Sequence, residues 1–217
     1  MGEDTMTEPT TSGFTTYIGL LAKANELRHQ EDYEAAIALY IKSIEYFGES
    51  ADLLAVVASC YFALAGGTPD ETGRNFEAAI LWMEKAIELA PNDARLHADL
   101  AQYYALGFPD YERAIQEYRK AIELDPHSKE ALAGAAALYG VPEEVVTLDE
   151  AIGWLERVVQ LDPNDPNHHF RLGKLYWEAG RSADAEKEWL KALLCPQPLA
   201  SGSARMIESV LLVRKNT

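Results

Sequence analysis

The sequence predicts an all-α fold, a solenoid of about five helix–turn–helix repeats followed by a capping helix. A helix-ending phrase recurs at a nearly constant spacing. It reads KAIELAP at Lys85–Pro91, KAIELDP at Lys120–Pro126, 35 residues later, and VVQLDP at Val158–Pro163 after a further 37 residues. A unit of this length cannot bury its own apolar face, so successive repeats must stack on one another.

Small residues supply the second observation. A small residue opens the second helix of each repeat, and a large apolar residue follows four positions later. The small residues are Ala36, Ala79, Ala114, Ala151 and Ala185, and the large ones are Tyr40, Met83, Tyr118, Leu155 and Trp189. Small side chains let two helices approach closely. The pattern therefore indicates a closely packed helix pair in every repeat.

The elements follow in order along the chain. Residues 1–13, rich in Thr and Glu, are expected to be disordered. The repeats, numbered 1 to 5, fill residues 14–198, at about 17–50, 51–93, 94–128, 129–165 and 166–198. Proline ends several second helices, and neighbouring Asp or Asn residues cap the next helix. Residues 199–217 are expected to form an amphipathic helix that caps repeat 5. Its apolar stripe is Met206, Ile207, Val210 and Leu211.

These repeats resemble the tetratricopeptide repeat (TPR) family, whose unit is two antiparallel helices with a period of 34 residues. The resemblance rests on the anchors above and on first-helix patterns such as Leu172-Gly173 followed by Tyr176. It implies a right-handed α-α solenoid whose first helices line a concave groove. In this family such a groove holds an extended peptide or a helix of a partner protein.

Charge narrows the possible partners. The 217 residues carry a net charge of −16, with 30 acidic and 11 basic residues over 1–165 but 5 acidic and 8 basic residues over 166–217. A predominantly acidic surface argues against nucleic acid, which needs a basic stripe. No apolar stretch approaches the roughly 18 to 20 residues that span a bilayer, so membrane insertion is not expected. The first residues lack the features of a secretory signal, and the two cysteines lie in different repeats, so we expect a cytoplasmic protein.

Projecting the family pattern onto this sequence gives candidate groove residues. They are Asn25 in repeat 1, Ser59 and Phe62 in repeat 2, Arg95 and Gln102 in repeat 3, and Phe170, Arg171, Lys174 and Trp177 in repeat 5. The repeat 5 residues are the expected main anchor, since they combine cations with aromatic surface. Repeat 4 contributes Ala133, Gly134 and Ala137, which leave room for a partner backbone or merely tighten helix packing. Some members of this family clamp the C-terminal carboxylate of chaperone tails with Lys, Asn and Arg side chains. At the corresponding positions of this sequence only Asn25 and Arg95 fit, and Asp99 would repel a carboxylate. We therefore reject a role as a chaperone co-factor of that kind.

Two repeats are longer than the family period. Extra residues are expected in the inter-helix loops near Gly66–Arg74 of repeat 2 and Gly140–Glu144 of repeat 4. The same two repeats carry Trp82 and Trp154 at one equivalent position. Either each tryptophan packs under its own loop, or the loops and tryptophans form a second contact edge.

The sequence carries no convincing catalytic, cofactor or metal motif. The glycine-rich stretch at 66–73 lacks the Gly-Lys-Ser/Thr ending of a phosphate loop. Adjacent helical residues point about 100° apart, so His168 and His169 cannot share a metal ion. His97 and His169 occupy equivalent positions at which the family places a packing aromatic residue. We therefore expect a protein without enzymatic activity.

The favoured function is a scaffold or adaptor that binds a protein segment in the groove. Two alternatives remain open. The basic C-terminal repeat could meet the acidic repeats of another copy, giving a salt-sensitive, head-to-tail homo-oligomer. Alternatively, the chain could be a regulatory subunit that docks on an enzyme through the loop edge, which deletion of residues 67–73 would test.

Overall fold

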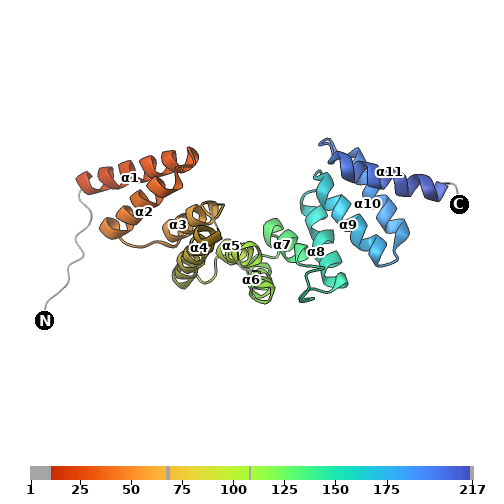
Figure 1. Cartoon of the computed structure of the whole chain (residues 1–217), viewed down its shortest axis with the longest axis horizontal. Coiled ribbons are helices and arrows are strands. Elements are labelled where there is room, and N and C mark those ends of the chain that lie inside the picture. The colour runs from red at the N-terminus through yellow and green to blue at the C-terminus, as the bar shows by residue number, and fades with distance from the viewer. Residues whose placement is uncertain (1–10, 67–68, 108, 216–217) are drawn as a thin grey trace. The chain divides into compact units, whose positions relative to one another are not determined.

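The computed structural model describes residues 11–66, 69–107 and 109–215. All regular secondary structure in these ranges is helical, which confirms the all-α prediction (Figure 1). The helices are α1 Thr11–His29, α2 Tyr33–Phe47, α3 Ala51–Ala63, α4 Pro69–Leu89, α5 Ala94–Leu106, α6 Tyr111–Leu124, α7 Lys129–Ala137, α8 Leu148–Leu161, α9 Pro166–Glu178, α10 Ser182–Leu194 and α11 Ser201–Lys215. Two helices therefore fall in each of the five repeats, and α11 follows them.

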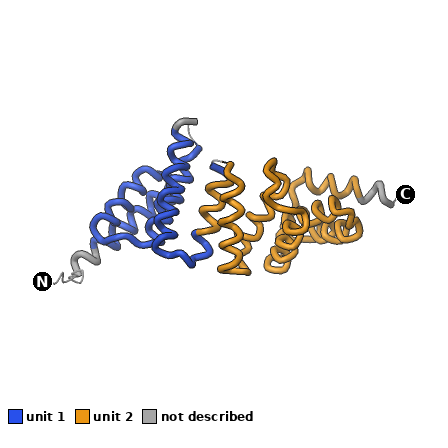
Figure 2. The backbone as a smooth tube through the Cα atoms, turned by 90° about the horizontal axis from the view of Figure 1, so that it is seen from below, with its two compact units in different colours: residues 1–96, 106–108 blue, residues 97–105, 109–217 orange. Residues whose placement is uncertain are grey.

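The chain forms two compact units (Figure 2). The N-terminal unit comprises residues 1–96 and 106–108, and the C-terminal unit comprises residues 97–105 and 109–217. Within each unit, consecutive helices pack against one another, as α3 does with α4 and α9 with α10. This nearest-neighbour packing is the pattern of an α-α solenoid.

Short polar side chains begin many of the helices. Asp32, Ser50, Asp110, Ser128 and Thr147 each accept a hydrogen bond from a backbone N–H in the first turn of the helix that follows. These bonds satisfy backbone donors that have no partner inside the helix. Local sequence therefore sets where these helices start.

The recurring small and large residues form the core. Each of the five alanines that open the second helices is fully buried, and each large residue that follows is at most 6% exposed. In the N-terminal unit a cluster of Ala24, Ala36, Ile37, Tyr40, Leu53, Val57 and Cys60 joins α1, α2 and α3. The sequence pattern thus marks the surfaces at which helices meet.

Two glycines are needed for this packing. A Cβ atom on Gly173 of α9 would lie 2.4 Å from Cδ1 and Nε1 of Trp189 on α10. A Cβ atom on Gly134 of α7 would lie 2.4 Å from the ring of Tyr118 on α6. The expectation that Gly134 leaves room for a partner is therefore wrong, because the Tyr118 ring already occupies that space.

The two insertions have different structures. In repeat 2 we expected a loop over Gly66–Arg74. That expectation is wrong for residues 69–74, which form the first turns of α4. Pro69 is the first helical residue, where its fixed backbone torsion favours a helix, and Glu71 places negative charge in the first turn. In repeat 4 the insertion does form a loop, which joins α7 to α8.

The structure describes only part of each end of the chain. Residues 1–10, for which disorder is expected, lie outside the described residues, and residues 11–13 belong to α1. At the other end α11 packs against α10, and Ile207 of the expected apolar stripe is fully buried. The side chain of Leu211 lies outside the described residues. None of the helices over residues 11–66, 69–107 and 109–215 is long and apolar enough to cross a membrane.

Candidate functional site

A cleft opens between α7 and α9 in the C-terminal unit. Its volume is about 390 Å³. Ala136 and Ala137 of α7 line one side, and Arg171, Lys174 and Glu178 of α9 line the other, with Leu155 of α8 also contributing. We call this space the groove cleft. Its lining residues come from repeat 4 and from the first helix of repeat 5.

The groove cleft is open because Leu155, which lines it, is smaller than the residue at the equivalent position of the preceding repeat. Leu155 is the repeat 4 equivalent of Tyr118, which in repeat 3 fills the space beside Gly134. Leucine has a shorter side chain than tyrosine, and Arg171 occupies the position equivalent to Gly134. Arg171 therefore lines a cleft at the position where, one repeat earlier, the Tyr118 ring packs against Gly134.

Arg171 and Lys174 give this cleft its positive charge. Arg171 is half-buried, and its Nη2 atom donates to the carbonyl oxygen of Ala133 at 3.5 Å, a long hydrogen bond. Burial lowers the pKa of Arg171. Lys174 is exposed, and neither cation pairs with a carboxylate among the residues that the structure describes. A guanidinium has five N–H donors, so most of those of Arg171 remain available to an anion.

Tyr139 and Glu178 both line the groove cleft and are joined by a hydrogen bond. The Tyr139 hydroxyl donates to Oε1 of Glu178 at 2.5 Å, and this hydrogen bond raises the pKa of Tyr139. The bond connects the segment after α7 to the end of α9. It also engages the carboxylate that lines the cleft.

A second cleft lies beside the first. Its volume is about 460 Å³, and it is lined by the loop between α7 and α8, including Val141, Pro142, Val146 and Leu148. We call it the loop cleft. Tyr139 and Gly140 line both clefts, so the repeat 4 insertion and the groove meet at these residues.

The predicted aromatic anchor does not lie in either cleft. The ring of Trp177 stacks at a tilt on Trp189, with ring centroids 5.6 Å apart, and Trp177 remains 43% exposed. The carbonyl oxygen of Phe170 accepts a hydrogen bond from Nε1 of Trp189 at 3.3 Å. The structure thus brings together Arg171 and Lys174 of the predicted anchor and places Phe170 and Trp177 beside α10.

Most groove candidates of repeats 1 to 3 have partners within the chain. Asn25 accepts from the Tyr40 hydroxyl at 2.6 Å, and the Ser59 hydroxyl donates to the Val56 carbonyl at 2.8 Å. Phe62 makes an edge-to-face contact with Phe76. Arg95 pairs with Asp52 at 2.7 Å and with Asp93 at 3.4 Å. Gln102 is exposed on α5.

The two tryptophans of the inserted repeats are both half-buried. Trp82 packs against the core cluster of α1, α2 and α3, and Lys85 lies over its ring at 5.1 Å. That cluster contains residues of α3 from the same repeat and of α1 and α2 from the neighbouring repeat. Trp154 lies on α8 and lines neither the groove cleft nor the loop cleft.

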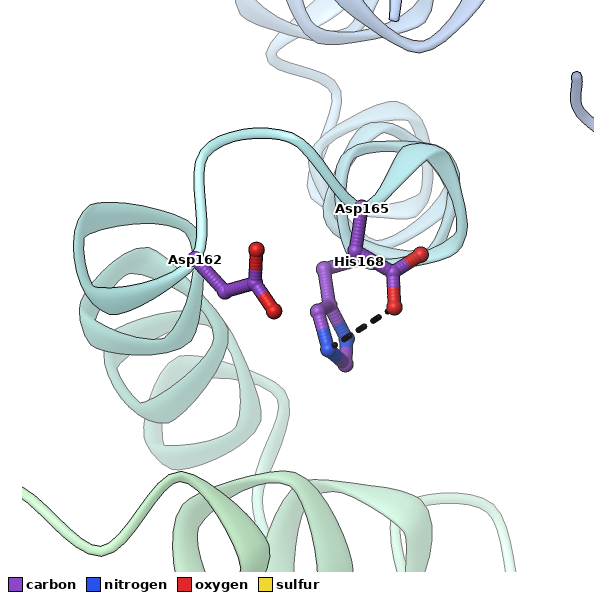
Figure 3. A group of neighbouring side chains, drawn as sticks. All are labelled: Asp162, Asp165 and His168. Atoms are coloured by element: carbon purple, nitrogen blue, oxygen red, sulfur yellow. Dashed lines mark ion pairs between the residues drawn. The ribbon is translucent and has the colours of Figure 1, made fainter. Parts of the chain in front are cut away.

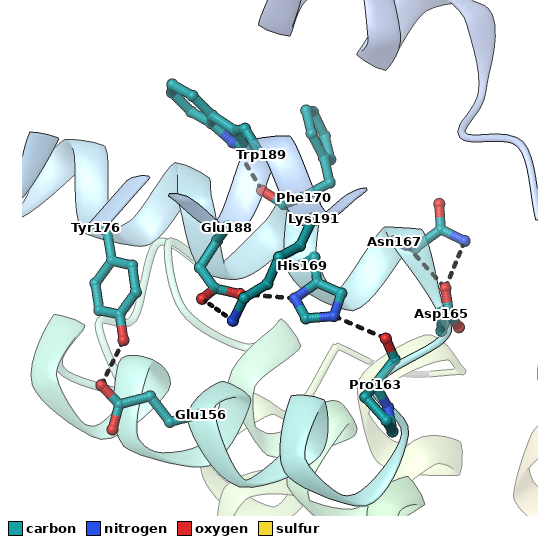
Figure 4. A network of polar contacts seen from close by, with 10 residues as sticks. All are labelled: Glu156, Pro163, Asp165, Asn167, His169, Phe170, Tyr176, Glu188, Trp189 and Lys191. Atoms are coloured by element: carbon teal, nitrogen blue, oxygen red, sulfur yellow. Dashed lines mark hydrogen bonds and ion pairs between the residues drawn. The ribbon is translucent and has the colours of Figure 1, made fainter. Parts of the chain in front are cut away.

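The two histidines that occupy the family's packing-aromatic positions each pair with a glutamate, in a buried contact in repeat 5 and a part-buried one in repeat 3. His169 Nδ1 lies 2.6 Å from Glu188, its Nε2 lies 3.1 Å from the Pro163 carbonyl, and Lys191 pairs with Glu188 at 2.7 Å (Figure 4). In repeat 3, His97 lies 2.6 Å from Glu117 in the same way. The sequence reasoning missed the pairs, although the signal was present. Repeats 3 and 5 alone carry both His in the first helix and Glu in the second helix at these equivalent positions.

One group of side chains has the composition of a metal site. Ligand atoms of Asp162, Asp165 and His168 lie within 4.8 Å of one another between α8 and α9 (Figure 3). Asp162 pairs with Lys129 at 2.9 Å, and Asp165 accepts from the Asn167 backbone at the start of α9. These contacts explain both carboxylates as parts of a helix connection. The group therefore carries no argument for a metal.

Two family models match the chain. One, described as tetratricopeptide repeat, matches residues 21–94 and 71–129, and the other, described as TPR repeat, matches residues 147–180. The first of these models alone covers half of the chain. The chain belongs to the tetratricopeptide repeat family.

Two curated proteins are similar to part of the chain. Protein PHOX1 of Arabidopsis thaliana is 30% identical over 150 residues, which are 65% of this chain and 19% of that protein. Anaphase-promoting complex subunit 3 of Schizosaccharomyces pombe is 30% identical over 106 residues, which are 49% of this chain and 15% of that protein. The chain thus spans less than a fifth of the length of either relative.

Solved structures show the same fold. PilF of Pseudomonas aeruginosa matches with a TM-score of 0.72 and 16% identity, covering 92% of this chain and 86% of that one. MamA of Desulfovibrio magneticus RS-1 matches with a TM-score of 0.64 and 16% identity over 82% of this chain and 93% of that one. YrrB matches with a TM-score of 0.59 and 21% identity over 82% and 84%. Family and fold are those of a protein–protein interaction scaffold, generally without catalytic activity.

Proposed function

We propose that this protein is a non-enzymatic scaffold or adaptor that binds a segment of a partner protein between α7 and α9. One observation carries the proposal. The half-buried guanidinium of Arg171 lines an open cleft of about 390 Å³ and pairs with no carboxylate among the described residues. A half-buried cation is costly to leave without a partner, and a carboxylate from another chain would supply one.

The charge of the chain supports the same assignment. The chain carries a net charge of −16, yet residues 166–217 are basic on balance. Lys174 lies three positions after Arg171, on the same face of α9, and lines the same cleft. Two cations in the groove cleft attract an acidic partner segment, although the acidic remainder of the chain repels it.

The names of similar proteins support a binding role in general terms. YrrB is described as a tetratricopeptide repeat protein with an unusual peptide-binding site, and the fission yeast relative is a subunit of a complex. By analogy we propose a protein ligand for this chain. The analogy reaches the class of ligand, whereas the choice of α7 and α9 rests on Arg171 and its cleft.

Selection from a random peptide display library tests the proposal. Peptides that bind the wild-type chain should bind a variant carrying Arg171→Glu and Lys174→Glu at least about tenfold more weakly, a loss of about 1.4 kcal/mol. Lys187→Glu combined with Arg205→Glu is the matched control. It changes the net charge equally, at two exposed residues of α10 and α11 that line neither cleft. Equal affinity of the two double variants would contradict groove binding.

Self-association is a second candidate. On α10, Leu190 is 48% exposed and Leu194 is 82% exposed, next to a basic C-terminal segment. A second copy could pack against these leucines, with its acidic repeats placed close to the basic C-terminal segment. Sedimentation at several protein and salt concentrations tests this. A constant monomer mass would rule it out, and a mass that falls with added salt would support it.

A further inference from the structure

The loop of repeat 4 and the groove form one continuous surface, although the sequence suggested two alternative contact edges. Tyr139 and Gly140 line both the groove cleft and the loop cleft. A segment bound beside Arg171 therefore has the loop cleft next to it. The two contact surfaces need not be alternatives.

The walls of the two clefts differ in chemistry. Arg171 and Lys174 make the groove cleft cationic, and its one lining carboxylate, Glu178, already accepts the hydrogen bond of Tyr139. Val141, Pro142, Val146 and Leu148 supply the apolar lining of the loop cleft, and its polar side chains are Glu144, Thr147 and the hydroxyl-bearing Tyr139. An anion fits the first cleft, and an apolar side chain fits the second.

The loop that builds the second cleft is held at both ends. Leu138 and Val146 are each 4% exposed, so they anchor the loop in the core. At its end, the Thr147 hydroxyl accepts from the Glu150 backbone, and the Glu150 carboxylate accepts from the Thr147 backbone. Gly140 has a φ of 87°, a conformation that glycine adopts without strain. A loop fixed in this way loses little conformational entropy when a ligand binds.

We infer that the two clefts together recognise a linear protein segment in which an Asp or Glu side chain lies close to a large apolar side chain. The carboxylate would meet Arg171 and Lys174, and the apolar side chain would enter the loop cleft past Tyr139. This inference rests on the proposed groove binding and specifies the partner.

Geometry favours an acidic side chain over a chain terminus as the source of the carboxylate. Arg171 is half-buried in the cleft wall, whereas Lys174, one helical turn further on, is exposed. An Asp or Glu side chain reaches Arg171 while the peptide backbone stays at the mouth near Lys174. A terminal carboxylate would require the backbone itself to enter a cleft of about 390 Å³.

Synthetic peptides with blocked ends test the inference. A Gly-Ser background carries one Glu and one Leu at varied spacing, and parallel series lack the Glu, lack the Leu, or replace the Glu by a free C-terminal carboxylate. Fluorescence anisotropy measures their affinity for the full chain. One spacing should bind best, and loss of either side chain should weaken binding by about tenfold. Best binding by the free C-terminus would overturn the choice of an acidic side chain.

Two variants separate the clefts. Val141→Ser should abolish the preference for Leu and keep the preference for Glu, whereas Arg171→Glu with Lys174→Glu should do the reverse. Glu143→Ser, at an exposed residue of the same loop that lines neither cleft, is the control and should change neither preference. Circular dichroism confirms that each variant is folded.

The outcomes distinguish this inference from the proposed function. A preference for Glu that depends on Arg171, with no preference for Leu in the wild-type chain, overturns the two-cleft recognition and leaves groove binding in place. Peptide binding that is unaffected by charge reversal at Arg171 and Lys174 overturns both.

Discussion

Replacement of Gly173 by alanine probes the packing that positions α9. The added Cβ would lie 2.4 Å from Cδ1 and Nε1 of Trp189, whereas ordinary contacts begin at 3.4 Å. The indole ring or α9 must therefore move by about 1 Å, which a close-packed interior resists. The ring cannot move freely, because Trp189 is 2% exposed and its Nε1 donates to the Phe170 carbonyl.

The expected magnitude follows from two opposing terms. Overpacking of a core costs about 1–3 kcal/mol. Replacing glycine by alanine within a helix stabilises it by about 0.8–1.0 kcal/mol. Gly173→Ala should therefore lower the free energy of unfolding by about 1 kcal/mol, with a range from near zero to about 2.

Gly153→Ala is the matched control. Gly153 lies within α8 of the same unit, and nothing lies within 4 Å of the position of an added Cβ. This variant should be more stable than the wild-type chain by up to about 1 kcal/mol. The difference between the two variants isolates the cost of overpacking.

Urea unfolding followed by circular dichroism measures both variants. Tryptophan fluorescence reports in parallel on the summed environment of the four tryptophans, which include Trp189 and its neighbour Trp177. If Gly173→Ala unfolds at the same urea concentration as Gly153→Ala, or at a higher one, the contact between Gly173 and Trp189 does not restrict α9 and the reasoning is refuted.

Two further predictions concern the same unit. Thr147→Ala removes the reciprocal bonds with Glu150 at the start of α8, so it should destabilise the chain by about 1 kcal/mol in urea unfolding, while Glu143→Ala in the same loop should have little effect. Burial opposes ionisation of Glu188, but hydrogen bonds from Lys191 and His169 outweigh it and lower its pKa below the ordinary 4.5. A pKa that is lower in the folded than in the unfolded chain adds stability above the unfolded value, and this stability is lost as the pH falls below 4.5. Glu188→Gln should therefore flatten the acid limb of the stability–pH curve, and an unchanged limb would contradict the role of the pair.

The sequence identified the repeats well because their signals are local. Helix starts at residues such as Asp110 and Thr147 depend on a side chain and a backbone N–H a few positions away. The alanines that open the second helices recur at a period that can be read without coordinates. The insertion of repeat 2 was misjudged because its glycines favoured a loop, whereas Pro69 and the acidic residues after it start a helix.

The candidate site was predictable in part. Arg171 and Lys174 follow from the family position of α9, and both line the groove cleft, while their part in binding a partner stays a prediction. Phe170 and Trp177 were assigned to the same anchor, but the Trp177 ring stacks on Trp189 of α10, and the backbone carbonyl of Phe170 accepts a hydrogen bond from the Trp189 indole. The pairing depends on which face of α9 meets α10, and a first-helix pattern alone does not determine that.

By itself, the sequence determined that this protein is a series of helix pairs of the tetratricopeptide repeat family, because periodicity and capping act over one or two turns of helix. The tertiary structure decided which positions are filled and which are open. Tyr118 fills the space beside Gly134, while Leu155 leaves a cleft beside Arg171. The tertiary structure also decided that the groove cleft and the loop cleft meet at Tyr139. Both outcomes depend on side-chain volumes from different helices brought to one place, and such contacts between distant residues have no periodic signature in the sequence.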